Sequence, residues 1–205
     1  MCSIIGSYSK DKFLELVKLN EYRGSFSYSL TVYNENDSNT WKDFGLFNKD
    51  VLDNVRDGDF ILGHCQAPTN GLVRDYNRIH PYINDSIKLL HNGIIKKNDV
   101  DRINELLNTN YEWDTQALGE YIKNDFDRLS DVEGSFACCL IKDNKLFIFR
   151  NAISPLYVDR NANISSTKFK ESNMIEFNTI YQLDHLSHSF DGCSNFNNTH
   201  NPYYF

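Results

Sequence analysis

The sequence of 205 residues predicts one domain of the α+β class with largely antiparallel sheets. Strand-like stretches occur in both halves of the chain, and helical patterns separate them. Three short strand-like stretches after the chain midpoint follow one another with short connections, which is typical of antiparallel pairing. The hydrophobic content of 40% and the aromatic content of 14% are sufficient for a sizeable core.

The N-terminal part is expected to form a strand, a helix and a second strand. Residues 2–8 are mostly apolar and rich in β-forming residues, and apolar residues then recur at helical spacing. Ser9 stands where an N-cap is expected, and Gly24 lies just past the helix. Residues 25–33 alternate small polar and apolar side chains, as a half-buried strand does. Residues 34–40 have the composition of a loop.

The central part is expected to contain two strands, a long loop and two helices. Residues 59–67 and 86–95 are the strand-like runs. Residues 68–85 between them are rich in turn formers and long enough for a functional loop. Residues 99–107 and 114–129 have amphipathic helical patterns, and the aspartate that begins the second is placed to cap it.

The C-terminal part is expected to form short strands followed by a peripheral segment. The expected strands are residues 134–141, 145–150 and 155–159. Residues 142–144, with the sequence KDN, are expected to form the first turn. Because the sequence has little periodicity after about His188, a domain is expected over residues 1–188 and a tail or peripheral segment over residues 189–205.

Charge and composition exclude several classes of protein. The net charge of −7 argues against binding to nucleic acid or to an anionic membrane, because both require a basic surface. No apolar run approaches the roughly 18 residues of a membrane span, and the N-terminus lacks the apolar core of a signal peptide. A cytoplasmic location is therefore expected.

The cysteines indicate a reducing compartment. Their number is odd and none forms a CxxC pair, which is unlike a disulfide framework or a structural zinc site. They are Cys2, Cys65, Cys138, Cys139 and Cys193. Of the adjacent pair in the expected strand 134–141, one is expected in the core and the other at the periphery.

The cysteine directly behind the initiator methionine has two interpretations. A cysteine is small and buries easily, so it can be a simple core residue. If Met1 is removed, however, Cys2 carries a nucleophilic sulfur and a free α-amine on one residue. That amine titrates near pKa 7.7–8.0 and can accept the thiol proton, so nucleophile and base come already assembled.

Four motifs occur in the order found in one known family. They are MCSIIG at Met1–Gly6, YRG at Tyr22–Gly24, GHCQAPTNG at Gly63–Gly71 and HPYINDSIKLLHNGII at His80–Ile95. Together they resemble the glutaminase domain of class II glutamine amidotransferases, nearest to the glucosamine-6-phosphate synthase type. EGSFACCLI and RNAISPLYV are similar to the second half of that domain, so the resemblance spans roughly residues 2–158.

The resemblance implies both a fold and a reaction. The fold is the αββα sandwich of N-terminal-nucleophile hydrolases, with two largely antiparallel sheets. In the reaction, Cys2 attacks the side-chain amide of glutamine, ammonia leaves, and water hydrolyses the resulting thioester to glutamate. No cofactor or metal is implied.

The resemblance also assigns residues near the reacting amide. The side chain of Asn92 and the backbone of Gly93 would stabilise the tetrahedral oxyanion. The alternative is that this Asn-Gly pair is simply a tight turn after a strand. Arg23 of YRG would place a positive charge close to the nucleophile, and its alternative is an ordinary surface arginine.

Other residues would bind the rest of the substrate. Asp114 of YEWDTQ takes the place of the acidic residue that binds the α-amine, a role compatible with capping a helix. Thr69 and His64 are placed with the substrate-binding residues. His80 and His91 are interpreted as structural residues near the pocket, because the three histidines lack the spacing of metal ligands.

The sequence departs from the family where the α-carboxylate is bound. The family has an arginine two residues after the His of GHxR, and this chain has Gln66 there. Since glutamine lacks the charge and the bidentate geometry of arginine, either glutamine binds weakly, Arg74 substitutes, or the substrate is an amide without a free carboxylate. Ser3 also replaces the usual glycine beside the nucleophile.

Three functions remain open from the sequence. The first is an amidohydrolase without its own acceptor domain, which releases ammonia or passes it to a separate ammonia-accepting enzyme. The second is a catalytically weak binding or regulatory protein that keeps the fold, as Gln66 and Ser3 would allow. The third is an acylase with the same nucleophile and another amide substrate, against which HNGII counts.

Overall fold

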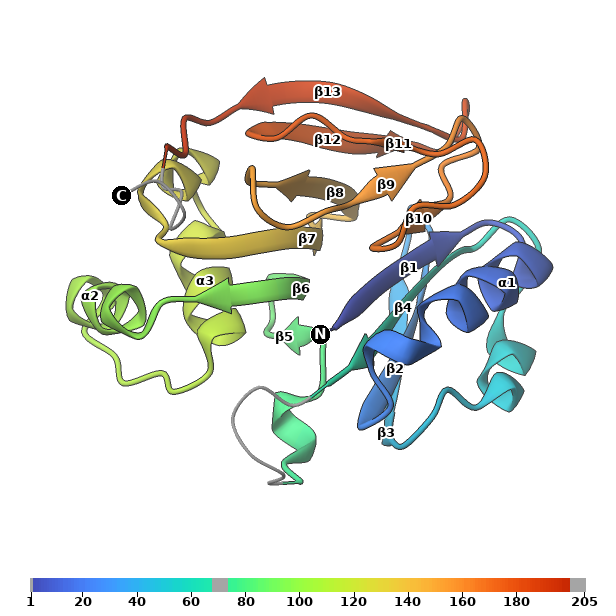
Figure 1. Cartoon of the computed structure of the whole chain (residues 1–205), viewed down its shortest axis with the longest axis horizontal. Helices are drawn as coiled ribbons and strands as arrows, with labels where there is room; N and C mark the ends of the chain where they lie inside the picture. Colours follow the sequence, from blue (N-terminus) through green and yellow to red (C-terminus); the bar gives the residue numbers. More distant parts are fainter. Residues whose placement is uncertain (1, 68–73, 200–205) are drawn as a thin grey trace.

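The computed structural model describes residues 2–67 and 74–199 and shows two β-sheets packed face to face (Figure 1). The first sheet contains, in spatial order, β11 (Asn173–Met174), β9 (Tyr157–Val158), β10 (Ile164–Ser165), β1 (Ser3–Ser7), β4 (Phe60–Gln66), β2 (Ser27–Tyr33) and β3 (Ser38–Phe44). The second contains β13 (Ser189–Asn195), β12 (Thr179–Asp184), β8 (Lys145–Arg150), β7 (Gly134–Lys142), β6 (Ile87–Ile95) and β5 (Tyr82–Ile83).

Helices cover the outer face of each sheet. The α-helices are α1 (Lys10–Asn20), α2 (Lys97–Leu107) and α3 (Asp114–Ile122), and the short 3₁₀ helices are η1 (Glu21–Arg23), η2 (Lys49–Asn54), η3 (Tyr76–Arg78) and η4 (Phe126–Asp131). Figure 1 shows α1 against the first sheet and α2 and α3 against the second. The layers are therefore α, β, β and α, as the resemblance implies.

The alternation of strand side chains builds three apolar layers. Ile4 of β1 packs between the sheets, whereas the next residue, Ile5, packs against α1. In β7, Cys138 faces α2 and α3 while Cys139 faces the other sheet. Both thiols are fully buried, so the expectation that one of them is peripheral is wrong. A strand covered on both faces has no exposed side.

The pairings recorded between described strands are antiparallel, as expected for this class. The turn between β7 and β8 confirms the prediction from KDN. Lys142 pairs with Lys145, and Asp143 and Asn144 between them both have positive φ. That backbone matches the twist of a two-residue hairpin.

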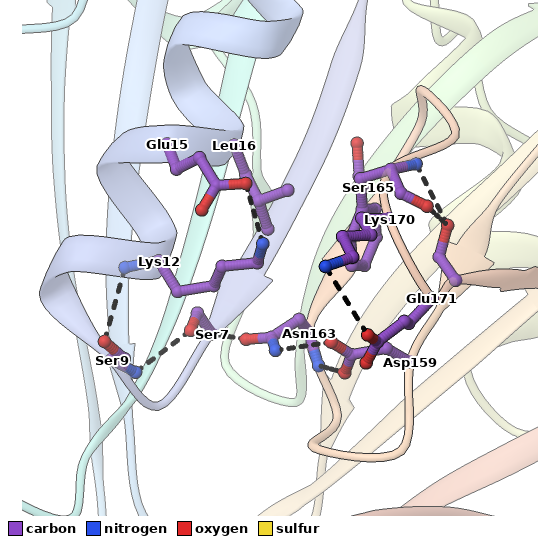
Figure 2. Close-up of polar contacts among 12 residues, drawn as sticks. Ser7, Ser9, Lys12, Glu15, Leu16, Asp159, Asn163, Ser165, Lys170 and Glu171 are labelled. Atoms are coloured by element: carbon purple, nitrogen blue, oxygen red, sulfur yellow. Dashed lines mark hydrogen bonds and ion pairs between the residues drawn. The ribbon is translucent and has the colours of Figure 1, made fainter.

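A chain of side-chain hydrogen bonds holds β1 in register at its C-terminal end (Figure 2). The Ser9 backbone N–H donates to Ser7 Oγ at 2.9 Å, and that hydroxyl donates to Asn163 Oδ1 at 2.6 Å. Asn163 Nδ2 in turn donates to Asp159 Oδ2 at 2.8 Å. Ser9 also caps α1 by accepting from the N–H of Lys12, as predicted. This network ties β1 to the turn that precedes β10.

Two segments expected to be irregular are edge strands. Residues 34–40 were expected to form a turn or loop; residues 34–37 do form a turn, but β3 begins at Ser38 and pairs with β2 over its whole length. Ser189–Asn195, the start of the expected tail, pairs with β12 as β13. Both strands are polar and partly exposed, so they lack the alternation that marks half-buried strands. The boundary at residue 188 stays a prediction.

The helix ends also differ from the expectations. The first of the two central helices, α2, begins at Lys97, and α3 ends at Ile122 rather than at residue 129. A separate 3₁₀ helix follows α3, from Phe126 to Asp131. Within the described ranges, no helix is both long enough and apolar enough to cross a membrane.

Candidate active site

Cys2 lies directly before β1 and is buried. Its Sγ donates to the carbonyl oxygen of Ala67 at 3.5 Å, and Arg23 Nε donates to the Cys2 carbonyl oxygen at 3.0 Å. Burial raises the pKa of the Cys2 thiol above its ordinary value. The thiol is therefore protonated at neutral pH, and it needs a base before it can act as a nucleophile.

Ser166 joins the strand of Cys2 to the strand of Asn92. Its hydroxyl oxygen accepts from the backbone N–H of Ile4 at 2.9 Å and from Asn92 Nδ2 at 3.1 Å. The amide nitrogen of Asn92 carries a second hydrogen, and Asn92 is itself buried. The bridge places the Asn92 amide beside β1 and fixes its orientation. No motif pointed to Ser166 in advance.

Gly93 has a backbone that no other residue could adopt without a shift. Its φ is +154°, and a Cβ there would lie 1.9 Å from the carbonyl oxygen of Ser135 in β7. Asn92 and Gly93 both lie inside β6 and pair with Ala137 and Phe136. The alternative that this Asn-Gly pair forms a tight turn is therefore wrong.

Asp114 occupies the first position of α3. Its Oδ2 accepts from the backbone N–H of Ile95 at 3.1 Å, and its Oδ1 accepts from the N–H of Thr115 at 2.8 Å. The N-cap position is held by Trp113, so the expectation that Asp114 caps the helix is off by one residue. Burial is the main cause that raises the pKa of the Cys2 thiol, and the negative charge of Asp114 raises this pKa further.

Gln66, at the end of β4, already has protein partners for its amide. Its Oε1 accepts from the Ser27 hydroxyl at 2.9 Å, and its Nε2 donates to the Arg78 carbonyl oxygen at 3.2 Å. Arg74 is exposed, with its guanidinium 5.4 Å from the centre of the Phe44 ring. Thr69 lies outside the described residues. Gln66 is thus held by the fold in the place where the family has an arginine.

Three buried histidines lie close to one another in the structure. His64 and His80 stack with ring centres 4.0 Å apart, and His91 accompanies them, all three buried. Burial lowers the pKa of His64 to about 3 and lowers that of His80 well below its ordinary value. His64 contacts the carbonyl oxygen of His91 at 3.2 Å. His64 is thus bonded to the backbone of β6, and its part in substrate binding stays a prediction.

Acidification is expected to destabilise the fold below about pH 6.5, because the unfolded chain then protonates histidines that the folded chain keeps neutral. Stability contributed by neutral His64 is complete above the unfolded pKa and is lost as the pH falls toward the folded value of about 3. The slope is about 1.4 kcal/mol per pH unit for each such histidine.

Urea unfolding at pH 7, 6 and 5 measures this dependence. His64→Gln, which keeps a donor at the Nε2 position, should flatten the dependence between pH 7 and 5. His188→Gln, at an exposed histidine, is the control for the exchange of residue type. An identical slope for His64→Gln and the unsubstituted chain would contradict the prediction.

Comparisons with known proteins agree with these features. No protein-family model matches the chain. The glutamine–fructose-6-phosphate aminotransferase [isomerizing] of Staphylococcus epidermidis is 29% identical over 184 residues, which cover 77% of this chain and 30% of the relative. The amidophosphoribosyltransferase of Methanothermobacter thermautotrophicus is 26% identical over 212 residues, covering 87% of this chain and 43% of the relative. The chain thus spans less than half the length of either relative.

A solved structure shows the same fold. The glutamine phosphoribosylpyrophosphate amidotransferase from B. subtilis, complexed with ADP and GMP, matches 93% of this chain and 49% of its own, with a TM-score of 0.71 at 15% identity. The chain is therefore a homologue of glutamine–fructose-6-phosphate aminotransferases and amidophosphoribosyltransferases, and it shares the fold of a glutamine amidotransferase, as the resemblance of its motifs predicts.

Proposed function

We propose that this chain hydrolyses the side-chain amide of glutamine to glutamate and ammonia, with Cys2 as the nucleophile. The observation that carries the proposal is the convergence of Cys2, Asn92 and Asp114 from three separate segments. Ser166 bonds both β1 and the Asn92 amide, and Asp114 bonds the backbone N–H of Ile95 in the same strand as Asn92. These are a nucleophile, an oxyanion donor and an anchor for an ammonium group.

In the proposed reaction, the α-amine freed by removal of Met1 accepts the thiol proton from Cys2. The sulfur bonds to the amide carbon, and the oxyanion is stabilised by the Asn92 side chain and the Gly93 backbone. The C–N bond then breaks, and the departing nitrogen takes the proton and leaves as ammonia. Water attacks the thioester, releases glutamate and restores the thiol.

Arg23 and Asp114 support this reaction by charge. Arg23 donates to the Cys2 carbonyl oxygen, which fixes the backbone of the nucleophile, and its charge favours the thiolate. Asp114 would bind the substrate α-ammonium. The ammonia is then either released as free product or passed to a separate acceptor enzyme, since the relatives named above are transferases.

Glutamate release from glutamine tests the proposal. The intact mass of the purified protein is measured first by mass spectrometry, because the mechanism requires that Met1 be absent. Incubation with a diazoketone analogue of glutamine should then add one label, located on Cys2 by peptide mass. A protein that lacks Met1, releases no glutamate and leaves Cys2 unlabelled would be the binding or regulatory protein instead. Cleavage of other amides without labelling would favour the acylase.

Gln66→Arg is expected to lower the KM for glutamine. A guanidinium at this position supplies a charged hydrogen bond to the α-carboxylate, worth about 1.5–3 kcal/mol, or about 10–100-fold in affinity. The exchange gives up the bond with Ser27, so a melting curve is measured beside the kinetics. Gln66→Met, similar in length but without donors, is the matched control. An unchanged KM for Gln66→Arg would mean that the carboxylate is bound elsewhere or is absent from the substrate.

A further inference from the structure

The hydroxyl of Thr115 lies between two buried imidazoles. Its Oγ1 is 3.0 Å from His80 Nε2 and 3.1 Å from His91 Nδ1. Thr115 itself is 1% exposed, so water does not compete for these contacts. A hydroxyl has one hydrogen to donate, so it cannot donate to both imidazoles.

The contacts of the rings determine where each hydrogen lies. His91 Nε2 is 3.2 Å from the Ser135 carbonyl oxygen, which can only accept, so this nitrogen carries the hydrogen. Nδ1 of a neutral His91 is then an acceptor, and the Thr115 hydroxyl donates to it. The other contact of that hydroxyl, to Asp114 Oδ1, is 3.5 Å long and too weak to compete for the hydrogen.

His80 completes the assignment. The Thr115 oxygen, having given its hydrogen to His91, accepts from His80 Nε2–H. His80 Nδ1 is left without a hydrogen. This nitrogen is buried and has no hydrogen-bond partner among the described residues. A buried N–H without an acceptor at this position would destabilise the folded state, and an unprotonated imidazole nitrogen without a donor destabilises it less.

Thr115 therefore joins the two ends of the proposed pocket. Its backbone N–H donates to Asp114 Oδ1 at 2.8 Å, and its hydroxyl bonds the ring of His91. His91 directly precedes Asn92 and Gly93 in β6. One residue thus connects the carboxylate proposed to bind the substrate amine to the groups proposed to bind the reacting amide.

We propose that Thr115 is a positioning residue that sets the separation between Asp114 and the Asn92–Gly93 donors, and so selects an amide side chain of the length of glutamine over that of asparagine. This inference rests on the proposed function. Asparagine is shorter by one methylene, and a misplacement of about 1 Å between anchor and reacting group can cost about 100-fold in rate. A rigid link between the two ends converts this length difference into selectivity.

Thr115→Val, Thr115→Ser and the matched control Thr31→Val test the proposal. Valine keeps the shape and removes the hydroxyl, while serine retains it. Thr31 is a fully buried threonine in β2 whose hydroxyl contacts only Thr40 among the described side chains. For Thr115→Val, kcat/KM for glutamine should fall about 10–100-fold, and the ratio of glutamine to asparagine turnover should fall with it. Thr115→Ser should keep kcat/KM for glutamine and the ratio of glutamine to asparagine turnover within a few-fold of the unsubstituted protein. Thr31→Val should match the unsubstituted protein in both quantities.

A second measurement separates this inference from the proposed function. In ¹⁵N spectra of histidine-labelled protein, His91 should be the Nε2–H form with a hydrogen-bonded Nδ1, and in Thr115→Val that Nδ1 signal should move to the position of an unbonded nitrogen. Thr31→Val should leave it in place. Unsubstituted protein without glutaminase activity would refute the proposed function, while the spectra still decide the Thr115 link. A hydrogen on His91 Nδ1, or unchanged selectivity in an active Thr115→Val, would overturn the inference.

Discussion

Cys2→Ala is expected to abolish glutamate release, lowering kcat by about 10⁴-fold or more, because the proposed thioester forms on the Cys2 sulfur. The substitution removes one sulfur atom from a buried position directly before β1. The fold should be affected little, since the thiol contributes a single long hydrogen bond to the Ala67 carbonyl oxygen. Glutamine should still bind, which equilibrium dialysis with labelled glutamine can measure.

The control for Cys2→Ala is Cys193→Ala. Cys193 is exposed in the edge strand β13, and its thiol contacts only the Ile180 carbonyl oxygen among the described groups. This variant should release glutamate at the rate of the unsubstituted protein. Equal activity of Cys2→Ala and Cys193→Ala would mean that the chemistry does not proceed through the N-terminal cysteine.

Gly93→Ala is expected to destabilise the fold by about 3 kcal/mol or more and to remove activity. The new Cβ would lie 1.9 Å from the Ser135 carbonyl oxygen, and that atom belongs to the backbone of the paired strand β7. A φ of +154° adds backbone strain for any residue with a side chain. Relieving the clash between the new Cβ and this carbonyl oxygen requires β6 and β7 to separate. That separation displaces the Gly93 N–H that is proposed to stabilise the oxyanion.

Urea unfolding of Gly93→Ala and Gly192→Ala compares two glycines in strands. At Gly192 the nearest heavy atoms to an added Cβ are 3.8 Å away, an ordinary contact, so this variant should unfold at the same urea concentration as the unsubstituted protein. The midpoint for Gly93→Ala should fall clearly below both. Coincident midpoints would show that β6 can move away from β7 at little cost.

Much of the fold could be predicted from the sequence because its central strands are buried. Residues 59–67, 86–95 and 134–141 are apolar runs, and the structure has β4, β6 and β7 there. The edge strands β3 and β13 could not be predicted in the same way. Their side chains are polar and partly exposed, and it is the backbone pairing with β2 and β12 that makes them strands.

The candidate site was predictable where chemistry requires a particular residue. Cys2, Asn92, Gly93 and Asp114 were expected from motifs in which a thiol, an amide donor, a flexible backbone or a carboxylate is needed. Ser166 and Thr115 carry ordinary hydroxyls, and a hydroxyl in a sequence has no signature of its own. Their importance follows from the groups on either side of them, which come from distant parts of the chain.

The sequence by itself determined much of the local structure and the chemical inventory: which stretches form the buried strands and the helices, and which residues supply a thiol, an amide and a carboxylate. Only the tertiary structure decided how these residues are joined. Ser166 ties β1 to Asn92, Thr115 ties Asp114 to His91, and Gln66 is bonded to Ser27 and Arg78. The reason is physical, since local propensity acts over a few neighbouring residues, whereas a hydrogen bond between distant segments exists only once the sheets have packed.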